Sequence, residues 1–126
     1  MTDQRPSLRD YARIALAAIR LFNGAAALFA PRILLRSLEA DPDKSAAALY
    51  AFRMFGVRTI IIGAQLLLPD GDVRRQALRT APIIHASDVA AARLAGLPPR
   101  AARTTTIISA VNTILAVLAQ PPRDRP

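Results

Sequence analysis

The amino-acid sequence predicts an all-α protein, an antiparallel four-helix bundle that crosses a membrane, in a single domain of residues 1–126. Its apolar residues recur in long Ala- and Leu-rich blocks, without the period of two that half-buried strands show. Proline, glycine and aspartate divide these blocks into four stretches of helical length. The connections between the stretches are short, and short connections imply antiparallel neighbours.

The first predicted helix covers residues 7–30 and ends before Pro31, because proline disrupts a helix interior. The segment PRILLRSLEA follows at residues 31–40. Its apolar residues alternate with charged residues at near-helical spacing. This pattern is typical of a short amphipathic helix that lies along a membrane interface.

The second predicted helix covers residues 44–68. DPDKS, residues 41–45, supplies a turn and a cap before it. PDGD, residues 69–72, is a strong turn signal, and its last aspartate can cap the third helix, residues 72–95.

The third helix contains Pro82, which has no backbone N–H and leaves the carbonyl of Leu78 without a helical donor. We therefore expect a kink there. GLPPRAA makes the next break, and the fourth helix covers residues 102–120, where two prolines end it. The tails, residues 1–6 and 121–126, are expected to be loose.

The charged residues favour a membrane protein over a soluble one. Of the 17 Lys and Arg residues only Lys44 is a lysine, and Glu39 is the sole glutamate. Soluble helices usually cover their wet faces with Glu and Lys pairs, which this chain lacks. We expect a multi-pass protein of the cell membrane. Basic residues are slightly more frequent on the side of the termini, which favours a cytoplasmic position for both.

Two arginines, Arg53 and Arg58, lie in the middle of the second helix. At the bilayer centre they cost roughly 5–7 kcal/mol together, whereas the Leu, Ile, Phe and Val residues of the helix contribute roughly 3–6 kcal/mol. Such a helix is stable in lipid only if its arginines turn inward, reach water or extend to the interface. We expect them to turn inward.

The candidate site is a buried polar network. Arg20 lies on a face of small and polar residues in the first helix. His85 and Asp88, three residues apart, share a face of the third helix. The network is expected to contain Arg20, Arg53, Arg58, His85 and Asp88. Asp88 can pair with one arginine, so the excess positive charge would attract a lipid phosphate, a carboxylate substrate or an acidic side chain of another subunit. A network that only fixes helix register would need the same residues.

Small residues mark the faces where helices approach closely. Gly56 and Gly63 form such a face on the second helix, and Gly24 lies on the corresponding face of the first. Ser109 and Asn112 continue a small and polar stripe along the fourth helix. We predict helix packing for these five residues.

Several function classes are disfavoured. Without cysteine, with one histidine and without paired carboxylates inside a helix, the chain offers no ligand set for a metal, and we expect no cofactor. A triad of His85, Ser87 and Asp88 is disfavoured because Ser87 lies two residues from His85 and one from Asp88, and residues one or two apart on a helix point apart. The net charge of +8 is spread along a chain with few aromatic residues. This favours anionic phospholipids over nucleic acid.

Three segments, RLFNGAAALFAP, RMFGVRTIIIGAQLLL and SDVAAARLAG, together resemble a family of small uncharacterised four-helix integral membrane proteins common in actinobacteria, DoxX-like in build. The resemblance covers residues 12–119 and implies a four-span membrane protein. The positions that match the recurrent polar and glycine residues are Arg20, Gly24, Arg53, Gly56, Arg58, Gly63 and Asp88. His85 stands where the family pattern has an acidic residue.

The sequence therefore indicates a non-enzymatic membrane component, such as an accessory subunit of a larger complex or a homo-oligomer. The alternative is a small transporter or a lipid- or anion-binding protein that uses the same polar cluster. A membrane enzyme with His85 as general base and Asp88 as its orienting group is the weakest of the three interpretations.

Overall fold

The computed structural model describes residues 5–38, 41–44 and 46–120, and within these ranges it contains helices and no strand. The elements are α1 (Leu8–Phe29), α2 (Pro31–Ser37), the 3₁₀ helix η1 (Pro42–Lys44), α3 (Ala46–Leu66), α4 (Asp72–Leu94) and α5 (Pro99–Leu118). The predicted all-helical class is confirmed. The bounds differ most at α5, which begins at Pro99 rather than near residue 102. Proline is favoured in the first helical turn, where no backbone donor is needed.

The short helix α2 forms within the segment predicted to be amphipathic. Pro31 begins it, Leu35 is buried on its inner side, and Arg32 and Arg36 are exposed. The end of the predicted segment, residues 39–40, lies outside the described residues. The cap expected at Ser45 and most of the two predicted loose tails also lie outside them.

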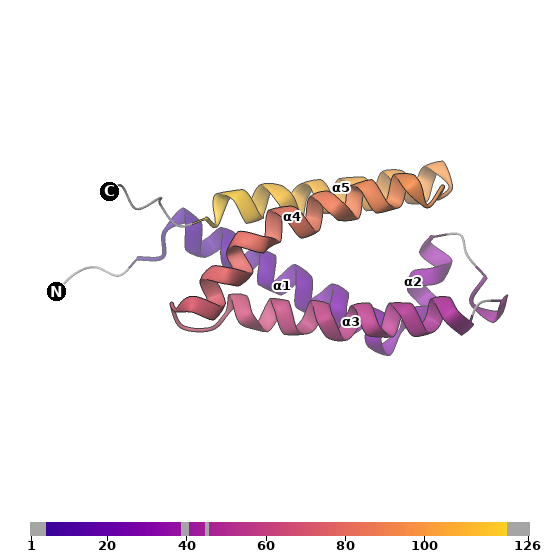
Figure 1. Ribbon diagram of the computed structural model, residues 1–126, viewed down its shortest axis with the longest axis horizontal. Helices are drawn as coiled ribbons and strands as arrows, with labels where there is room; N and C mark the ends of the chain where they lie inside the picture. The colour runs from indigo at the N-terminus through magenta and orange to yellow at the C-terminus, as the bar shows by residue number, and fades with distance from the viewer. Residues whose placement is uncertain (1–4, 39–40, 45, 121–126) are drawn as a thin grey trace.

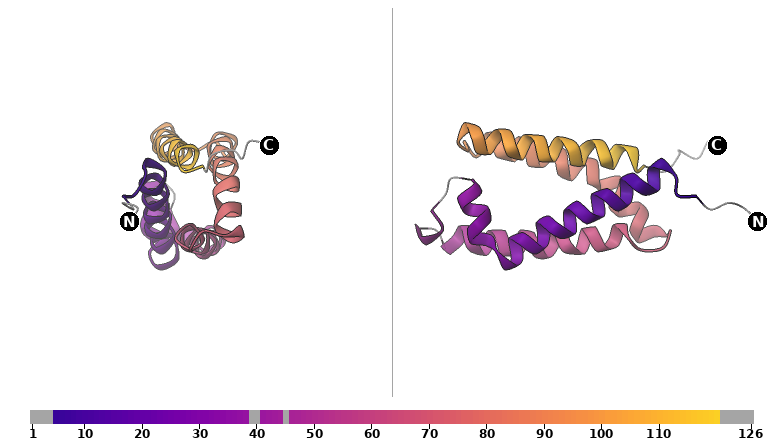
Figure 2. Two further views of the ribbon diagram at one scale, coloured as in Figure 1. Left: turned by 90° about the vertical axis from the view of Figure 1, so that its left-hand side faces the viewer. Right: turned by 180° about the vertical axis from the view of Figure 1, so that it is seen from behind.

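The long helices form two pairs. α1 packs mainly against α3, and α4 packs mainly against α5. All four meet at the end of the molecule that carries the termini, where α5 ends beside the start of α1 and the α3–α4 connection lies (Figures 1 and 2). At the other end the α1–α3 pair, together with α2, diverges from the α4–α5 pair. We refer to these as the closed end and the open end.

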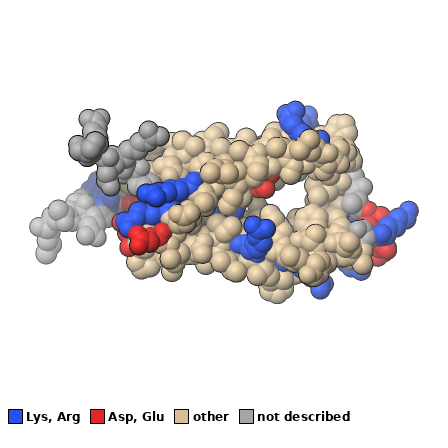
Figure 3. Space-filling model, viewed as in Figure 1, with Lys and Arg blue, Asp and Glu red and all other residues tan. Residues whose placement is uncertain are grey.

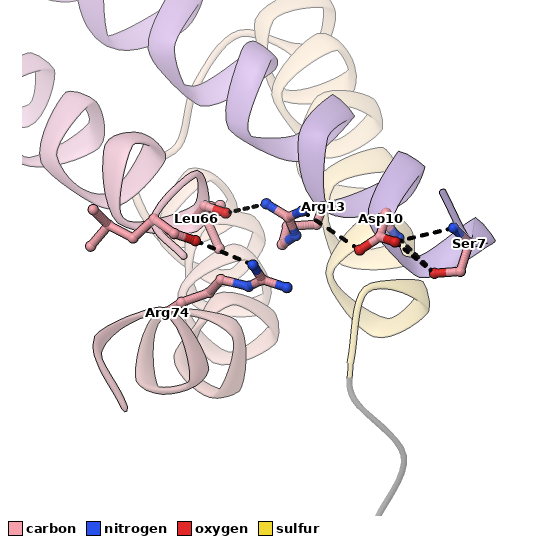
Figure 4. A network of polar contacts seen from close by, with 6 residues as sticks. Ser7, Asp10, Arg13, Leu66 and Arg74 are labelled. Atoms are coloured by element: carbon pink, nitrogen blue, oxygen red, sulfur yellow. Dashed lines mark hydrogen bonds and ion pairs between the residues drawn. The ribbon is translucent and has the colours of Figure 1, made fainter. Parts of the chain in front are cut away.

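Arginine side chains fasten the closed end (Figure 4). Arg13 of α1 donates from Nη1 to the carbonyl of Leu66 at 2.7 Å, and Arg74 of α4 donates to the carbonyl of Leu68 at 3.2 Å. The last carbonyls of a helix lack partners within the helix, so Arg13 satisfies the end of α3, and Arg74 binds the turn that follows it. They also tie α1, α3 and α4 together.

A bend in α4 produces the divergence. The first part of the helix rises from α3, and the second part runs along α5 (Figure 1). Pro82 lies inside the helix, as expected for the predicted kink. The carbonyl of Leu78, which Pro82 leaves without a helical donor, accepts a hydrogen bond from the side-chain amide of Gln120. The bend is therefore stabilised by a residue just beyond α5.

The backbones of α1 and α3 approach each other closely at two glycines. A Cβ atom built on Gly56 would lie 2.6 Å from the carbonyl oxygen of Gly24 and 2.7 Å from the backbone nitrogen of Leu28. One built on Gly24 would meet Ile60 at 2.8 Å. A Cβ atom built on Gly63 would lie 3.0 Å from the side chain of Leu21 and 3.3 Å from the carbonyl oxygen of Ala17. No larger residue fits at Gly56 without a shift of the backbone.

Among the described helices, α1, α3 and α5 are long and apolar enough to cross a membrane. The sequence predicts four such spans, but α4 does not meet the requirement because it is more polar than the other three. Its charged residues are Asp72, Arg74, Arg75, Arg79, Asp88 and Arg93. Large apolar side chains are exposed on all three qualifying helices, including Phe22, Ile61 and Ile114. On the face shown in Figure 3, charged groups cluster at the two ends of the molecule, and further charged groups lie between them. The three apolar helices and their exposed apolar side chains are typical of a membrane protein.

Candidate functional site

A cavity of about 420 Å³ lies between the two helix pairs, within the size range of small-molecule sites. All five α-helices contribute to its wall. Figure 3 shows the molecule hollowed between the α3 and α4–α5 sides, toward α2. The polar side chains in the wall are Arg20, Asn23, Ser37, Thr59, His85, Asp88, Thr104, Thr105, Ser109 and Asn112.

The deepest polar contact joins α1 to α4. Arg20 is 4% exposed and His85 is 1% exposed. Nη1 of Arg20 lies 3.2 Å from Nε2 of His85. A guanidinium can only donate, so Nε2 must be the acceptor, which places the histidine proton on Nδ1 of a neutral ring. The arginine thus selects the histidine tautomer.

Asp88 lies on the other side of the same imidazole. Its Oδ2 is 3.8 Å from Nδ1 of His85, too far for a direct hydrogen bond. The carboxylate is at the cavity edge, with 41% of its side chain exposed. The ring of His85 therefore stands between the positive charge of Arg20 and the negative charge of Asp88.

Three buried polar atoms of this site have no hydrogen-bond partner in the described part of the chain. They are Nε of Arg20, Nδ1 of His85 and Oδ1 of Asn112. Arg20 and Asn112 are each at least nine-tenths buried and line the cavity. Buried polar atoms nearly always have partners, so these three atoms can bind the polar groups of a molecule in the cavity.

The expectation that Arg53 and Arg58 turn inward is wrong, because both side chains are exposed. The buried residues of α3 are Gly56, Thr59, Gly63 and Leu66. At about 100° per residue, Arg58 projects away from this face. The close crossing of α1 at Gly56 leaves no room for an arginine on the inner side.

The structure thus brings together Arg20, His85 and Asp88 but not the other two predicted members of the network. The predicted excess of positive charge in the interior is absent, since the described cavity wall carries one arginine and one aspartate. Ser109 and Asn112, expected at packing positions, are both buried in the cavity wall. Gly24 and Gly56 lie at the α1–α3 crossing.

The cavity is also lined by four residues that were not predicted as site residues from the sequence, namely Asn23, Thr59, Thr104 and Thr105. Helical projection places several of these residues on the inner faces of their helices. That projection is the sequence signal by which they could have been found. The cavity itself depends on the divergence of the helix pairs, which no local pattern shows.

Among the described residues no group of three or more His, Cys, Asp or Glu side chains could hold a metal ion. The hydroxyl and amide groups around Arg20 can instead surround a polar head group with hydrogen bonds. Comparison with known proteins found no matching family model, no similar curated protein and no similar solved structure. The resemblance to the actinobacterial four-helix family stays a prediction from the sequence.

Proposed function

We propose that this chain is a non-enzymatic integral protein of the cell membrane that binds the acidic head group of a lipid-like molecule. Its four long helices form an antiparallel bundle across the bilayer, with both termini on the cytoplasmic side. The observation that carries the proposal is Arg20, a buried guanidinium with an unpartnered Nε in the wall of a 420 Å³ cavity.

The side chains around Arg20 suit an acidic oxygen. A guanidinium binds carboxylates and phosphates through parallel hydrogen bonds, and these bonds are stronger than neutral ones. His85 occupies one Nη atom of Arg20, while Nε remains without a partner. Ser109 and Thr59, both buried in the same wall, add hydroxyl donors.

The polar helix α4 is the inner wall of the proposed bundle. Its basic residues occur in the first turns, at Arg74, Arg75 and Arg79, and in the last turn, at Arg93. Long side chains near helix ends can extend to the interface. Asp88, the charged residue between them, faces the cavity. Such a helix can cross the bilayer beside three apolar ones.

Replacing Arg20 by glutamine tests the proposed function. We expect the amount of acidic lipid that co-purifies in mild detergent to fall about tenfold, which corresponds to the loss of one charge-assisted contact of about 1.4 kcal/mol. Mass spectrometry of the extracted lipids measures the amount of acidic lipid bound to each variant. The matched control is Arg53→Gln, which removes an exposed arginine outside the cavity wall. An equal lipid content in the wild type and the Arg20 variant would refute the proposal.

A second candidate function, an accessory subunit, is favoured by one observation. Arg58 is exposed eight residues before the end of α3, about 12 Å from that end at 1.5 Å per residue. An unpaired arginine deep in lipid costs about 2.5–3.5 kcal/mol. A carboxylate on a partner subunit would neutralise it.

Arg58→Leu tests this second candidate. If α3 faces an acidic partner, the variant should lose the proteins that co-purify with the wild type in a mild detergent. Quantitative mass spectrometry of the purified particles reads the result. Arg9→Leu, which removes an exposed arginine near the start of α1, is the control. A wild-type particle that contains this chain alone would exclude a role as an accessory subunit.

A further inference from the structure

An apolar groove of about 480 Å³ runs between α1 and α5. Its residues are Ala18, Ile19, Phe22, Asn23, Ile107, Ile108, Val111 and Asn112. Asn23, Ile108 and Asn112 also line the polar cavity. The groove and the cavity therefore adjoin along the gap between α1 and α5.

The two spaces differ sharply in chemistry. The groove beyond the shared asparagines is lined by alanine, isoleucine, phenylalanine and valine. Phe22 is 74% exposed and Ile107 is 56% exposed, so the groove opens on the outer surface of the molecule. The cavity on the other side of Asn112 contains Arg20 and His85. A molecule that occupied both spaces would have one charged end and one hydrocarbon end.

The groove alone cannot select a ligand in a bilayer. Lipid tails are as apolar as its walls, so burial of a chain there gains little free energy. The contacts of the head group with Arg20 supply affinity, and the groove determines where the chain lies. The lateral opening lets such a molecule enter from the bilayer instead of from water.

We propose that the ligand is an amphiphile with an acidic head group and a single hydrocarbon chain, which enters between α1 and α5. This inference rests on the proposed function. Its head group contacts Arg20 and Asn112, and its chain lies against Ile107 and Val111. A fatty acid and a lysophosphatidic acid share this chemistry, because a carboxylate and a phosphate both accept from a guanidinium.

Photocrosslinking tests the position of the chain. The protein in phosphatidylcholine nanodiscs is exposed to palmitate that carries a diazirine at its last carbon, and the adducts are mapped by peptide mass spectrometry. We expect adducts at the groove residues of α1 and α5, which excess palmitate removes. Parallel competition with lysophosphatidic acid shows which acidic head group binds more tightly. Adducts spread over the outer face of α3 would overturn the inference.

A substitution that fills the groove gives a second readout. Ala18→Phe places a ring in the groove without changing the cavity wall, and we expect about tenfold fewer adducts on α1 and α5. The control is Ala110→Phe, an exposed position on α5 outside both linings. Circular dichroism verifies that both variants are folded. An equal adduct yield in the two variants would also count against the groove.

The two proposals can fail separately. Saturable palmitate binding that requires Arg20 but gives adducts elsewhere would refute the groove and leave the head-group site intact. If neither palmitate nor lysophosphatidic acid binds saturably to the wild type, the proposed function fails along with the groove.

Discussion

Replacing Gly56 by alanine is expected to lower the free energy of unfolding by about 3 kcal/mol, because the added methyl group has no space. The Cβ atom would lie 2.6 Å from the carbonyl oxygen of Gly24 and 2.7 Å from the backbone nitrogen of Leu28. Both are backbone atoms, so no side-chain rotation relieves the clash. The α1 and α3 helices must then separate, and close packing of small residues is what holds helices together in lipid.

Gly71→Ala is the matched control for this experiment. Its Cβ would meet a single neighbour, the carbonyl oxygen of Pro69, at an ordinary 3.8 Å. Unfolding of the detergent-solubilised variants with increasing dodecyl sulfate, followed by circular dichroism, gives both free energies. The close crossing would be disproved if the two variants unfolded at the same denaturant fraction.

Replacing His85 by leucine is expected to destabilise the delipidated protein by about 3 kcal/mol. Leucine fills most of the space of the ring but cannot accept the hydrogen bond from Nη1 of Arg20. Arg20 is 4% exposed, so its guanidinium would then be buried without the acceptor that it has in the wild type. An unpaired charged donor in a protein interior costs more than a neutral one, for which about 1–3 kcal/mol is typical.

His85→Gln separates the loss of the hydrogen bond from the loss of the ring. The glutamine carbonyl can accept from Arg20, so we expect this variant to unfold within about 1 kcal/mol of the wild type. The same dodecyl sulfate titration measures all three proteins. If the leucine variant were as stable as the glutamine variant, the contact between Arg20 and His85 would contribute nothing to stability.

The helices could be predicted from the sequence because their signals are local. Pro31, Pro69 and the prolines at positions 98 and 99 interrupt the apolar blocks, and a helix ends or begins within three residues of each of them. The kink predicted at Pro82 follows from the chemistry of one residue, and α4 is bent in the structure (Figure 1). The hydrogen-bond partner of the Leu78 carbonyl could not be predicted in this way, because Gln120 is 42 positions away along the chain.

The candidate site could be predicted in part for the same reason. Arg20 and His85 each lie on the face of their helix that carries small residues, and both are buried. To predict the orientation of Arg53 and Arg58, one must know which side of α3 packs against α1. The crossing at Gly56 decides this, and it is a property of two helices together. The cavity depends on three further helices and has no signature in any one segment.

The closed end and the open end make the molecule mechanically asymmetric along its length. Arg13 and Arg74 join three helices at the closed end, while the two helix pairs diverge toward the other (Figure 1). If the bundle spans a bilayer as proposed, lateral pressure in the leaflet at the closed end acts on helices held together by hydrogen bonds, whereas pressure in the opposite leaflet acts directly on the spacing of the two pairs. Under that proposal the width of the cavity would depend more on the lipid composition of one leaflet than on that of the other.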